Sequence, residues 1–228
     1  MHIEIWSDIA CPWCYVGKRR LEAALGRFPH RDEVQLTWRS FELDPTAPAE
    51  RPEDAATHLA HKYGRTVEEA RAMNDNLAKI AAGDGLEYHL DALRLGNTFD
   101  AHRLTHLAKG HGVQGAMEER LMRAYLTEGE LLSDRDTLER LAAEVGLPRD
   151  EAREVLLTDR FAEDVRDDER TAAALGIHAV PFFVVDRRIA ASGAQPPEVL
   201  LELLERARPA EPAMPVVTGG EVCGPDGC

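Results

Sequence analysis

Basic residues and long apolar runs are both scarce in this sequence. Its 228 residues carry 27 Lys and Arg against 41 Asp and Glu, which gives a formal net charge of −14. Nucleic-acid binding depends on clustered Lys and Arg, and an acidic chain repels polyanions and anionic lipid headgroups. No uncharged run approaches the roughly 18–20 apolar residues that a membrane-spanning helix requires. We therefore expect neither a nucleic-acid partner nor a membrane partner.

A recognisable secretory signal is also missing. The segment from Met1 to Trp6 has no basic stretch followed by an apolar one. On this ground we expect a cytoplasmic protein. With 44% hydrophobic and 30% charged residues, the composition is that of an ordinary globular protein rather than a disordered chain.

Cysteine is rare too, and its distribution is informative. The four cysteines form two short pairs, Cys11 with Cys14 and Cys223 with Cys228, and none lies between residues 15 and 222. A structural disulfide framework would spread its cysteines over distant loops and would need an oxidising compartment. The pairing instead favours redox catalysis or metal binding.

The predicted elements begin with a strand, a helix and a second strand. Alternating apolar residues predict strands over residues 2–6 and 34–41, and helical spacing predicts a helix between them that ends near Phe28. Near the C-terminus, residues 180–185 predict an apolar strand, followed by a short strand near Ile189. A last helix is expected to begin at Pro196.

The segment 52–176 contains no convincing strand. It shows helical spacings and helix start signals, including the apparent capping boxes Thr66 with Glu69 and Ser133 with Asp136. The chain is therefore predicted to run β-α-β, then a helical block, then β-β-α.

Cys11 and Cys14 are placed for dithiol chemistry. Pro12 suits the first position of a helix, so that Cys11 becomes the N-cap residue. There the free N–H groups of Trp13 and Cys14 and the positive end of the helix dipole would favour a thiolate. Cys14 lies three residues on, within disulfide range and facing the core. We predict Cys11 as the attacking nucleophile and Cys14 as the resolving thiol, with Pro12 and Trp13 tuning the redox potential.

The same cysteine spacing also occurs in zinc sites. A proline between the sulfurs at a helix start counts against that interpretation, and we predict no metal. No organic cofactor is expected either, because the dithiol itself carries two electrons. A zinc-binding protein whose four cysteines converge on one ion stays open as a non-enzymatic alternative.

Several segments resemble one protein family. Ser7–Gly17, Asn97–Leu104 and Ser192–Gln195, together with Val180-Pro181 ahead of the hairpin, are similar to the FrnE-like branch of the DsbA-family thioredoxin-fold oxidoreductases. The match covers about residues 1 to 206. It implies an α/β thioredoxin-like fold built from residues 1–51 and 177–208, with residues 52–176 as a large all-helical insertion domain. Residues 209–228, of which eight are Pro or Gly, are expected to form a flexible tail.

The resemblance also implies roles for individual residues. Cys11 attacks, Cys14 resolves, and a cis Val180–Pro181 bond packs beside them, with Val180 contacting the substrate chain. Asn97, Thr98 and His102 start a helix that borders the active-site groove and are candidate substrate contacts; the sequence alone equally allows Asn97 or Thr98 as an N-cap. The implied partners are protein or small-molecule thiols and disulfides, glutathione among them.

The tail pair suggests a second redox step. The segment 224–227 suits a type I turn that brings Cys223 and Cys228 within disulfide range. The chain from residue 207 to 223 reaches at most about 50 Å, against a radius of gyration of about 17 Å for a domain of this size. We hypothesise that this pair exchanges disulfides with Cys11 and Cys14. A local disulfide or metal site without catalytic role is the alternative.

The function predicted from the sequence is therefore thiol–disulfide oxidoreduction by protein disulfide exchange or isomerisation. Its direction depends on the redox potential, which the sequence does not fix. A glutathione-dependent transferase or isomerase of the same superfamily is the alternative enzyme, although such enzymes typically replace the cysteine pair by a single hydroxyl or thiol.

Overall fold

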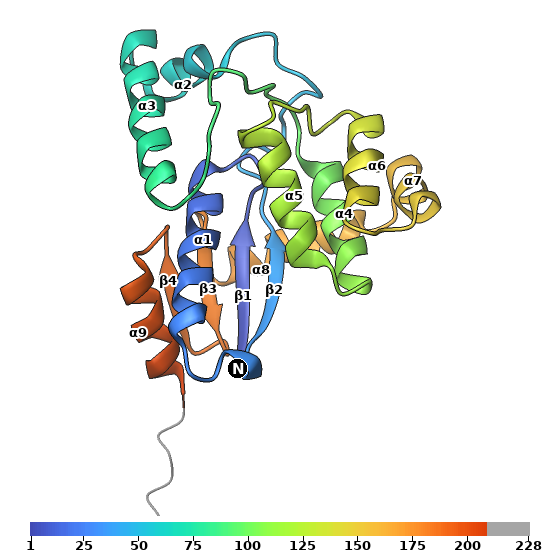
Figure 1. The fold of residues 1–228 in the computed structure, drawn as a ribbon. Helices are drawn as coiled ribbons and strands as arrows, with labels where there is room; N and C mark the ends of the chain where they lie inside the picture. Colours follow the sequence, from blue (N-terminus) through green and yellow to red (C-terminus); the bar gives the residue numbers. More distant parts are fainter. Residues whose placement is uncertain (209–228) are drawn as a thin grey trace, which may run out of the picture.

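A computed structural model describes residues 1–208, and its strands form one mixed sheet (Figure 1). The strands are β1 (His2–Ser7), β2 (Gln35–Ser40), β3 (Phe182–Val185) and β4 (Ile189–Ser192), in the order β2-β1-β3-β4. β1 pairs in parallel with β2 and antiparallel with β3, and β4 is antiparallel to β3. All four strands lie where the sequence predicts them, and the sheet confirms the α/β thioredoxin-like fold.

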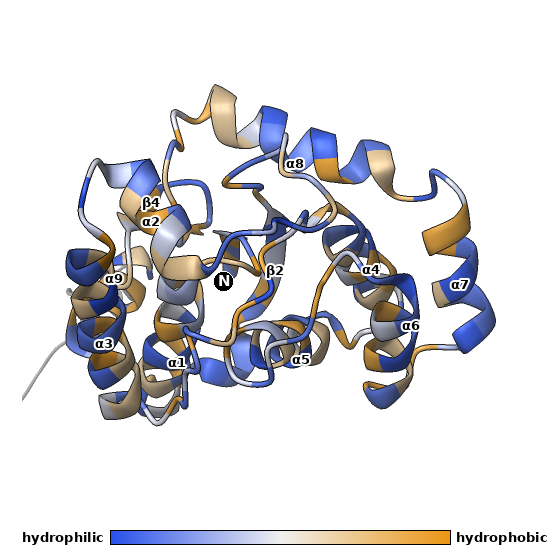
Figure 2. Cartoon of the chain, turned by 90° about the horizontal axis from the view of Figure 1, so that it is seen from above, coloured by the Kyte–Doolittle hydropathy of each residue, from blue (hydrophilic) through white to orange (hydrophobic). Residues whose placement is uncertain are grey.

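Helices cover both faces of the sheet. On one face, α1 (Pro12–Arg27) and α9 (Pro197–Ala207) pack on Ile3, Ile5 and Phe183. On the other face, Trp6 packs against α8 (Ala162–Ala174). Viewed from above, α8 lies on one side of the strands and α1 and α5 on the other (Figure 2). Alternate residues of β1 therefore serve two separate apolar layers.

The segment between β2 and β3 is helical throughout its regular elements. In the described residues it forms α8 and, ahead of it, α2 (Ala55–Tyr63), α3 (Val67–Gly83), α4 (Phe99–Gly110), α5 (Gln114–Leu126), α6 (Arg135–Glu144) and α7 (Arg149–Leu157). Among them, α2 and α3 share a small apolar cluster formed by Ala56, Ala60 and Ala70. The largest apolar cluster joins Leu104, Met117 and Leu121 of the insertion to Cys14 and Val16 of α1.

Two helix starts test the capping predictions. Thr66 and Glu69 form the predicted capping box at the start of α3. The second prediction is wrong by one residue, because Asp134 caps α6 by accepting from the Thr137 N–H at 2.9 Å. The hydroxyl of Ser133 donates instead to the carbonyl of Ala49. Asp and Ser are comparable N-cap residues, so a Ser-Asp pair leaves the helix start undecided.

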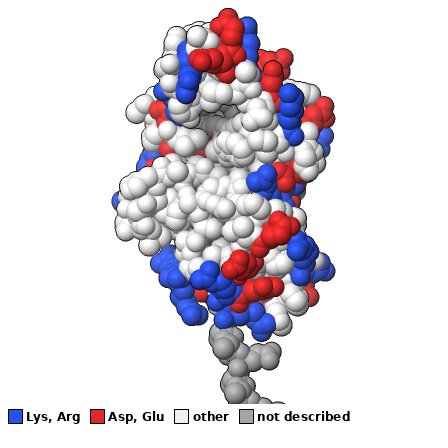
Figure 3. All heavy atoms as spheres, turned by 90° about the vertical axis from the view of Figure 1, so that its left-hand side faces the viewer, with Lys and Arg blue, Asp and Glu red and all other residues white. Residues whose placement is uncertain are grey.

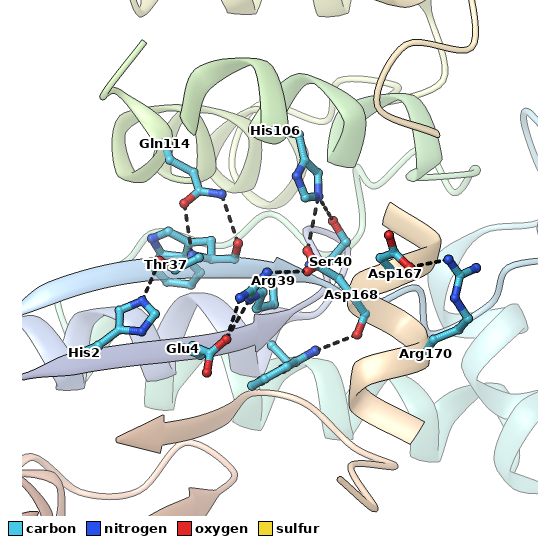
Figure 4. A network of polar contacts seen from close by, with 12 residues as sticks. His2, Glu4, Thr37, Arg39, Ser40, His106, Gln114, Asp167, Asp168 and Arg170 are labelled. Atoms are coloured by element: carbon cyan, nitrogen blue, oxygen red, sulfur yellow. Dashed lines mark hydrogen bonds and ion pairs between the residues drawn. The ribbon is translucent and has the colours of Figure 1, made fainter. Parts of the chain in front are cut away.

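A buried polar network fastens α8 to the sheet (Figure 4). Arg39 of β2 contacts Glu4 of β1 at 2.6 Å and Asp168 of α8 at 2.8 Å. Asp168 also accepts from the backbone N–H of Ser40 at 3.0 Å, while its carbonyl accepts from Trp6 Nε1. Hydrogen bonds from Arg187 and Arg39, partly offset by burial, lower the pKa of Glu4 to about 2. Asp168 of α8 is therefore a buried partner of the sheet.

Candidate active site

The cysteine pair lies at the start of α1, where β1 ends. Cys11 is the N-cap residue, Pro12 is the first helical residue, and both Cys11 and Cys14 are free thiols. The Cys11 N–H donates to the carbonyl of Asp8 at 3.0 Å, and the Cys14 N–H donates to the carbonyl of Cys11 at 3.0 Å. These backbone hydrogen bonds help to hold the two cysteines on one turn.

The Cys11 sulfur does not make the predicted contacts with the helix N–H groups. No side-chain capping bond forms, and the thiol donates instead to the carbonyl of Val180 at 3.8 Å. The proline loop thus supplies a polar contact of this sulfur. The sulfur is therefore held between the helix start and that loop.

The two thiols have different surroundings. Cys11 is 5% exposed and Cys14 is 1% exposed, whereas Trp13 between them is 40% exposed. Burial and the neighbouring Cys11 raise the pKa of the Cys14 thiol well above its ordinary value, against the opposing effect of Ser7 and Asp8. Cys14 is therefore stabilised as a protonated thiol behind the more accessible sulfur.

The proline loop packs directly against α1. The Val180–Pro181 peptide bond is cis. A Cβ atom at Gly17 would lie 2.9 Å from Pro181 Cγ and 3.3 Å from Phe183 Cζ. Only glycine leaves room for this approach, which explains its place six residues after Cys11.

Tyr88, which sequence reasoning missed, holds the cysteine turn from the insertion side. Its hydroxyl donates to the carbonyl of Pro12 at 2.6 Å, and its ring stacks on Tyr15 with centroids 6.2 Å apart. Tyr88 follows α3 in a segment without any motif, so only the tertiary fold could reveal this contact.

A buried acid lies just before the cysteines. Asp8, which is 2% exposed, accepts from the backbone N–H groups of Ala10 at 3.2 Å and Leu43 at 2.7 Å. His102 Nε2 is 3.5 Å from Asp8 Oδ1, and His102 is 1% exposed. His102 is thus enclosed beside Asp8 in this structure, and its contact with substrate stays a prediction. It belongs to a charged cluster beneath the site.

Glu118 of α5 completes this cluster. Burial raises its pKa to about 7, with a further contribution from Asp8 and opposing contributions from His102 and Lys18. One of its carboxylate oxygens has no hydrogen-bond partner among residues 1–208. The charge of this carboxyl group therefore depends on pH around neutrality.

Asn97 and Thr98 start α4 as predicted, with different roles. Thr98 is the N-cap residue without a side-chain capping bond, and Asn97 Oδ1 accepts from the Phe99 N–H at 2.8 Å. The Asn97 amide also donates to Glu42 and to the carbonyl of Ala47. Asn97 therefore connects the start of α4 to Glu42 and Ala47, and Thr98 forms part of the wall of a cavity.

That cavity, of about 420 Å³, lies beside the cysteine turn. Cys11, Pro12 and Trp13 form part of its wall, and α2 and α3 supply much of the rest. The face that carries α2 and α3 is hollowed, with uncharged side chains below the hollow and charged side chains above it (Figure 3). Val180, Pro181, Asn97 and His102 do not line it.

Two further features of residues 1–208 concern metal binding and membrane spanning. Within this range no group of three or more His, Cys, Asp or Glu side chains is arranged to hold a metal ion. None of the helices described combines the length and apolar character needed to span a bilayer. Cys223 and Cys228, and the predicted flexible tail, lie outside the described residues.

Comparisons with known proteins agree with this geometry. A family model described as a DSBA-like thioredoxin domain matches residues 2–205. A probable DsbA oxidoreductase from Streptomyces coelicolor is 46% identical, with a TM-score of 0.88 over 100% of this chain and 98% of that one. An uncharacterised Bacillus subtilis protein, YwbO, is 26% identical over 81% of this chain and 86% of its own length. The cytosolic disulfide reductase DsbM from Pseudomonas aeruginosa, solved with GSH, shares the fold at 20% identity and a TM-score of 0.64, over 90% of this chain and 98% of that one. The chain belongs to the DsbA-like thioredoxin-domain family.

Proposed function

We propose that the protein is a thiol–disulfide oxidoreductase that works by dithiol–disulfide exchange through Cys11 and Cys14. The main support is the pair of free thiols at the start of α1, where Cys11 lines a cavity and Cys14 is 1% exposed. Membership of the DsbA-like family supports an oxidoreductase. The finer assignment to the FrnE-like branch stays a prediction.

The proposed reaction has two exchange steps. The Cys11 thiolate attacks one sulfur of a substrate disulfide, forming a mixed disulfide as the first thiolate leaves. Cys14 then loses its proton and attacks the Cys11 sulfur, which releases the second substrate thiol. The two cysteines give two electrons to the substrate as they form their disulfide, so no further cofactor is needed. Pro12 and Trp13 are proposed to tune the potential of this couple, and the backbone of Val180 to contact a polypeptide substrate.

Trapping tests the order of attack. With Cys14→Ser, a mixed disulfide between Cys11 and a model disulfide should accumulate, because the resolving thiol is gone. With Cys11→Ser, the buried Cys14 should form almost none. Mass spectrometry of the adducts gives the readout, and equal trapping by both variants would contradict the assigned roles.

The tail cysteines are proposed to act as a second redox pair. Cys223 and Cys228 would exchange with the Cys11–Cys14 disulfide and return it to the dithiol, becoming a disulfide themselves that an external thiol then reduces. A chain lacking residues 209–228 should then turn over more slowly while its first reduction of a substrate disulfide stays intact. Unchanged multiple turnover would show that the tail has no catalytic role.

The partners and the location follow from the same chemistry. We propose thiols and disulfides as substrates, in the cytoplasm, with glutathione as a candidate because DsbM, a cytosolic reductase of the same fold, was solved with it. A 2-hydroxychromene-2-carboxylate isomerase also shares the fold, at 12% identity. Glutathione-dependent isomerisation that survives Cys14→Ser would favour that alternative. One zinc ion per chain, lost on Cys223→Ser, would favour a metal-binding protein.

A further inference from the structure

The cavity beside Cys11 has the character of a small-molecule site. Its volume of about 420 Å³ lies within the range of roughly 300–1,000 Å³ that such sites occupy. Leu59 of α2, Leu77 of α3 and Tyr125 of α5 contribute to its wall together with Cys11. A group bonded to a sulfur that reacts with Cys11 would therefore be next to an apolar recess.

Exposed apolar side chains gather around this cavity. Eight large apolar residues of the described chain are exposed, and four of them line it: Trp13, Leu43, Tyr63 and Met73. Single exposed apolar residues are ordinary, but a contiguous group marks a binding surface. Figure 3 shows an uncharged part of the surface below the hollow.

Two of the polar residues in the wall already have ionic partners: Arg51 is bound to Asp44 at 2.5 Å, and His58 lies 2.8 Å from Glu53. Three others line the wall with side chains that form no ion pair or hydrogen bond among residues 1–208: Lys62, Asn74 and Asn76. A peptide such as glutathione could use these residues, so the rate comparison below must decide between it and an apolar group. An apolar group needs no such partners, and it would displace water from apolar surface.

The proline loop supplies nothing to this wall, since Val180 and Pro181 do not line it. The recess is therefore distinct from the loop where the family resemblance places a polypeptide substrate. It lies on the side of Cys11 that carries α2 and α3.

We propose that this cavity binds the apolar, aromatic-sized group of a low-molecular-weight disulfide whose sulfur reacts with Cys11. The inference rests on the proposed oxidoreductase function. The Cys11 thiolate bonds to the sulfur that bears the apolar group, while the substrate S–S bond breaks and the other thiolate leaves. Cys14 then attacks the Cys11 sulfur, and the apolar thiolate leaves. The two cysteines lose two electrons and two protons, which the substrate takes up as two thiols.

Alkyl 2-pyridyl disulfides test the proposal because they share one leaving group. The reduced full-length protein is mixed with phenethyl, hydroxyethyl or glutathionyl 2-pyridyl disulfide, and the release of thiopyridone gives the rate. Each rate is divided by that of N-acetylcysteine with the same reagent, which removes intrinsic reactivity. The phenethyl compound should react about tenfold faster than the hydroxyethyl compound on this scale.

Variants at the exposed cavity residues provide the matched comparison. Met73→Gln and Tyr63→Ser should lower the phenethyl rate severalfold and leave the hydroxyethyl rate unchanged. Leu175→Gln is the control, since Leu175 is 49% exposed, close to the 44% of Met73, but lies outside the cavity.

Equal relative rates for the phenethyl and hydroxyethyl compounds, or a phenethyl rate insensitive to Met73→Gln, would overturn the inference. If the glutathionyl compound reacted fastest, the proposal that the cavity binds an apolar group would be overturned. In each of these cases the Cys11–Cys14 disulfide would still form. Release of thiopyridone without that disulfide, seen by peptide mass, would instead overturn the proposed function beneath it.

Discussion

Replacement of Glu118 by glutamine should change how stability depends on pH. The pKa of this carboxyl rises from 4.5 to about 7 in the folded chain, because burial disfavours its charged form. The unfolded chain therefore releases the Glu118 proton at lower pH than the folded chain does. The folded state loses stability as the pH rises from about 4.5 through 7, and the Glu118→Gln variant would be free of that loss.

The size of the effect follows from linkage. A rise of the pKa from 4.5 to about 7 corresponds to about 3 kcal/mol in total, most of which develops between pH 5 and pH 8. From pH 5 to pH 8 the free energy of unfolding of Glu118→Gln should therefore rise by most of this amount relative to the wild type. Urea denaturation followed by circular dichroism at both pH values, on fully reduced protein, measures it.

The adjacent residue is the control. Hydrogen bonds from Arg19 and Lys18 outweigh the effect of burial and lower the pKa of Glu119 to about 2. Glu119 thus stays ionised in both states across most of this range, so Glu119→Gln should shift stability almost equally at pH 5 and pH 8. Parallel pH profiles for wild type and Glu118→Gln would refute the assignment of a near-neutral pKa to Glu118.

Two further predictions concern packing and the buried network. Gly17→Ala should destabilise the fold by about 1–3 kcal/mol, because its Cβ would press on Pro181. Gly26→Ala on the same helix meets nothing within 4 Å and should be neutral or stabilising. Equal effects of the two substitutions in thermal unfolding would count against the close approach of Gly17 to Pro181. Arg39→Met should cost about 3 kcal/mol, because it leaves buried carboxylates without their shared cation. A loss no larger than that of the exposed Arg31→Met would show that the network contributes little.

Local patterns in the sequence predicted most of the fold. Period-two alternation located β1 and β2, and the Cys11-Pro12 pair located the start of α1, because both signals depend on near neighbours in the chain. The capping of α6 was missed by one residue, since Ser133 and Asp134 are both suitable caps.

The surroundings of the site could not be predicted in the same way. Tyr88, Glu118 and Asp168 act through contacts with residues 76 to 162 positions away or through burial, and no local motif marks them. His102 lay in a recognisable segment, but its burial beside Asp8 depends on how α4 packs against β2 and the neighbouring helices. Burial and partner choice are properties of the assembled fold, and the spacing of a sequence does not encode them locally.

A redox titration of the cysteines tests the central claim most directly. The purified, metal-assayed protein is equilibrated across graded glutathione buffers and quenched with an alkylating agent, and the state of each cysteine is read by peptide mass. Cys11 and Cys14 should oxidise together as one two-electron couple, whose midpoint gives the direction of the reaction in a cytosolic pool. Cysteines that stay reduced across the whole range while zinc remains bound would contradict the account.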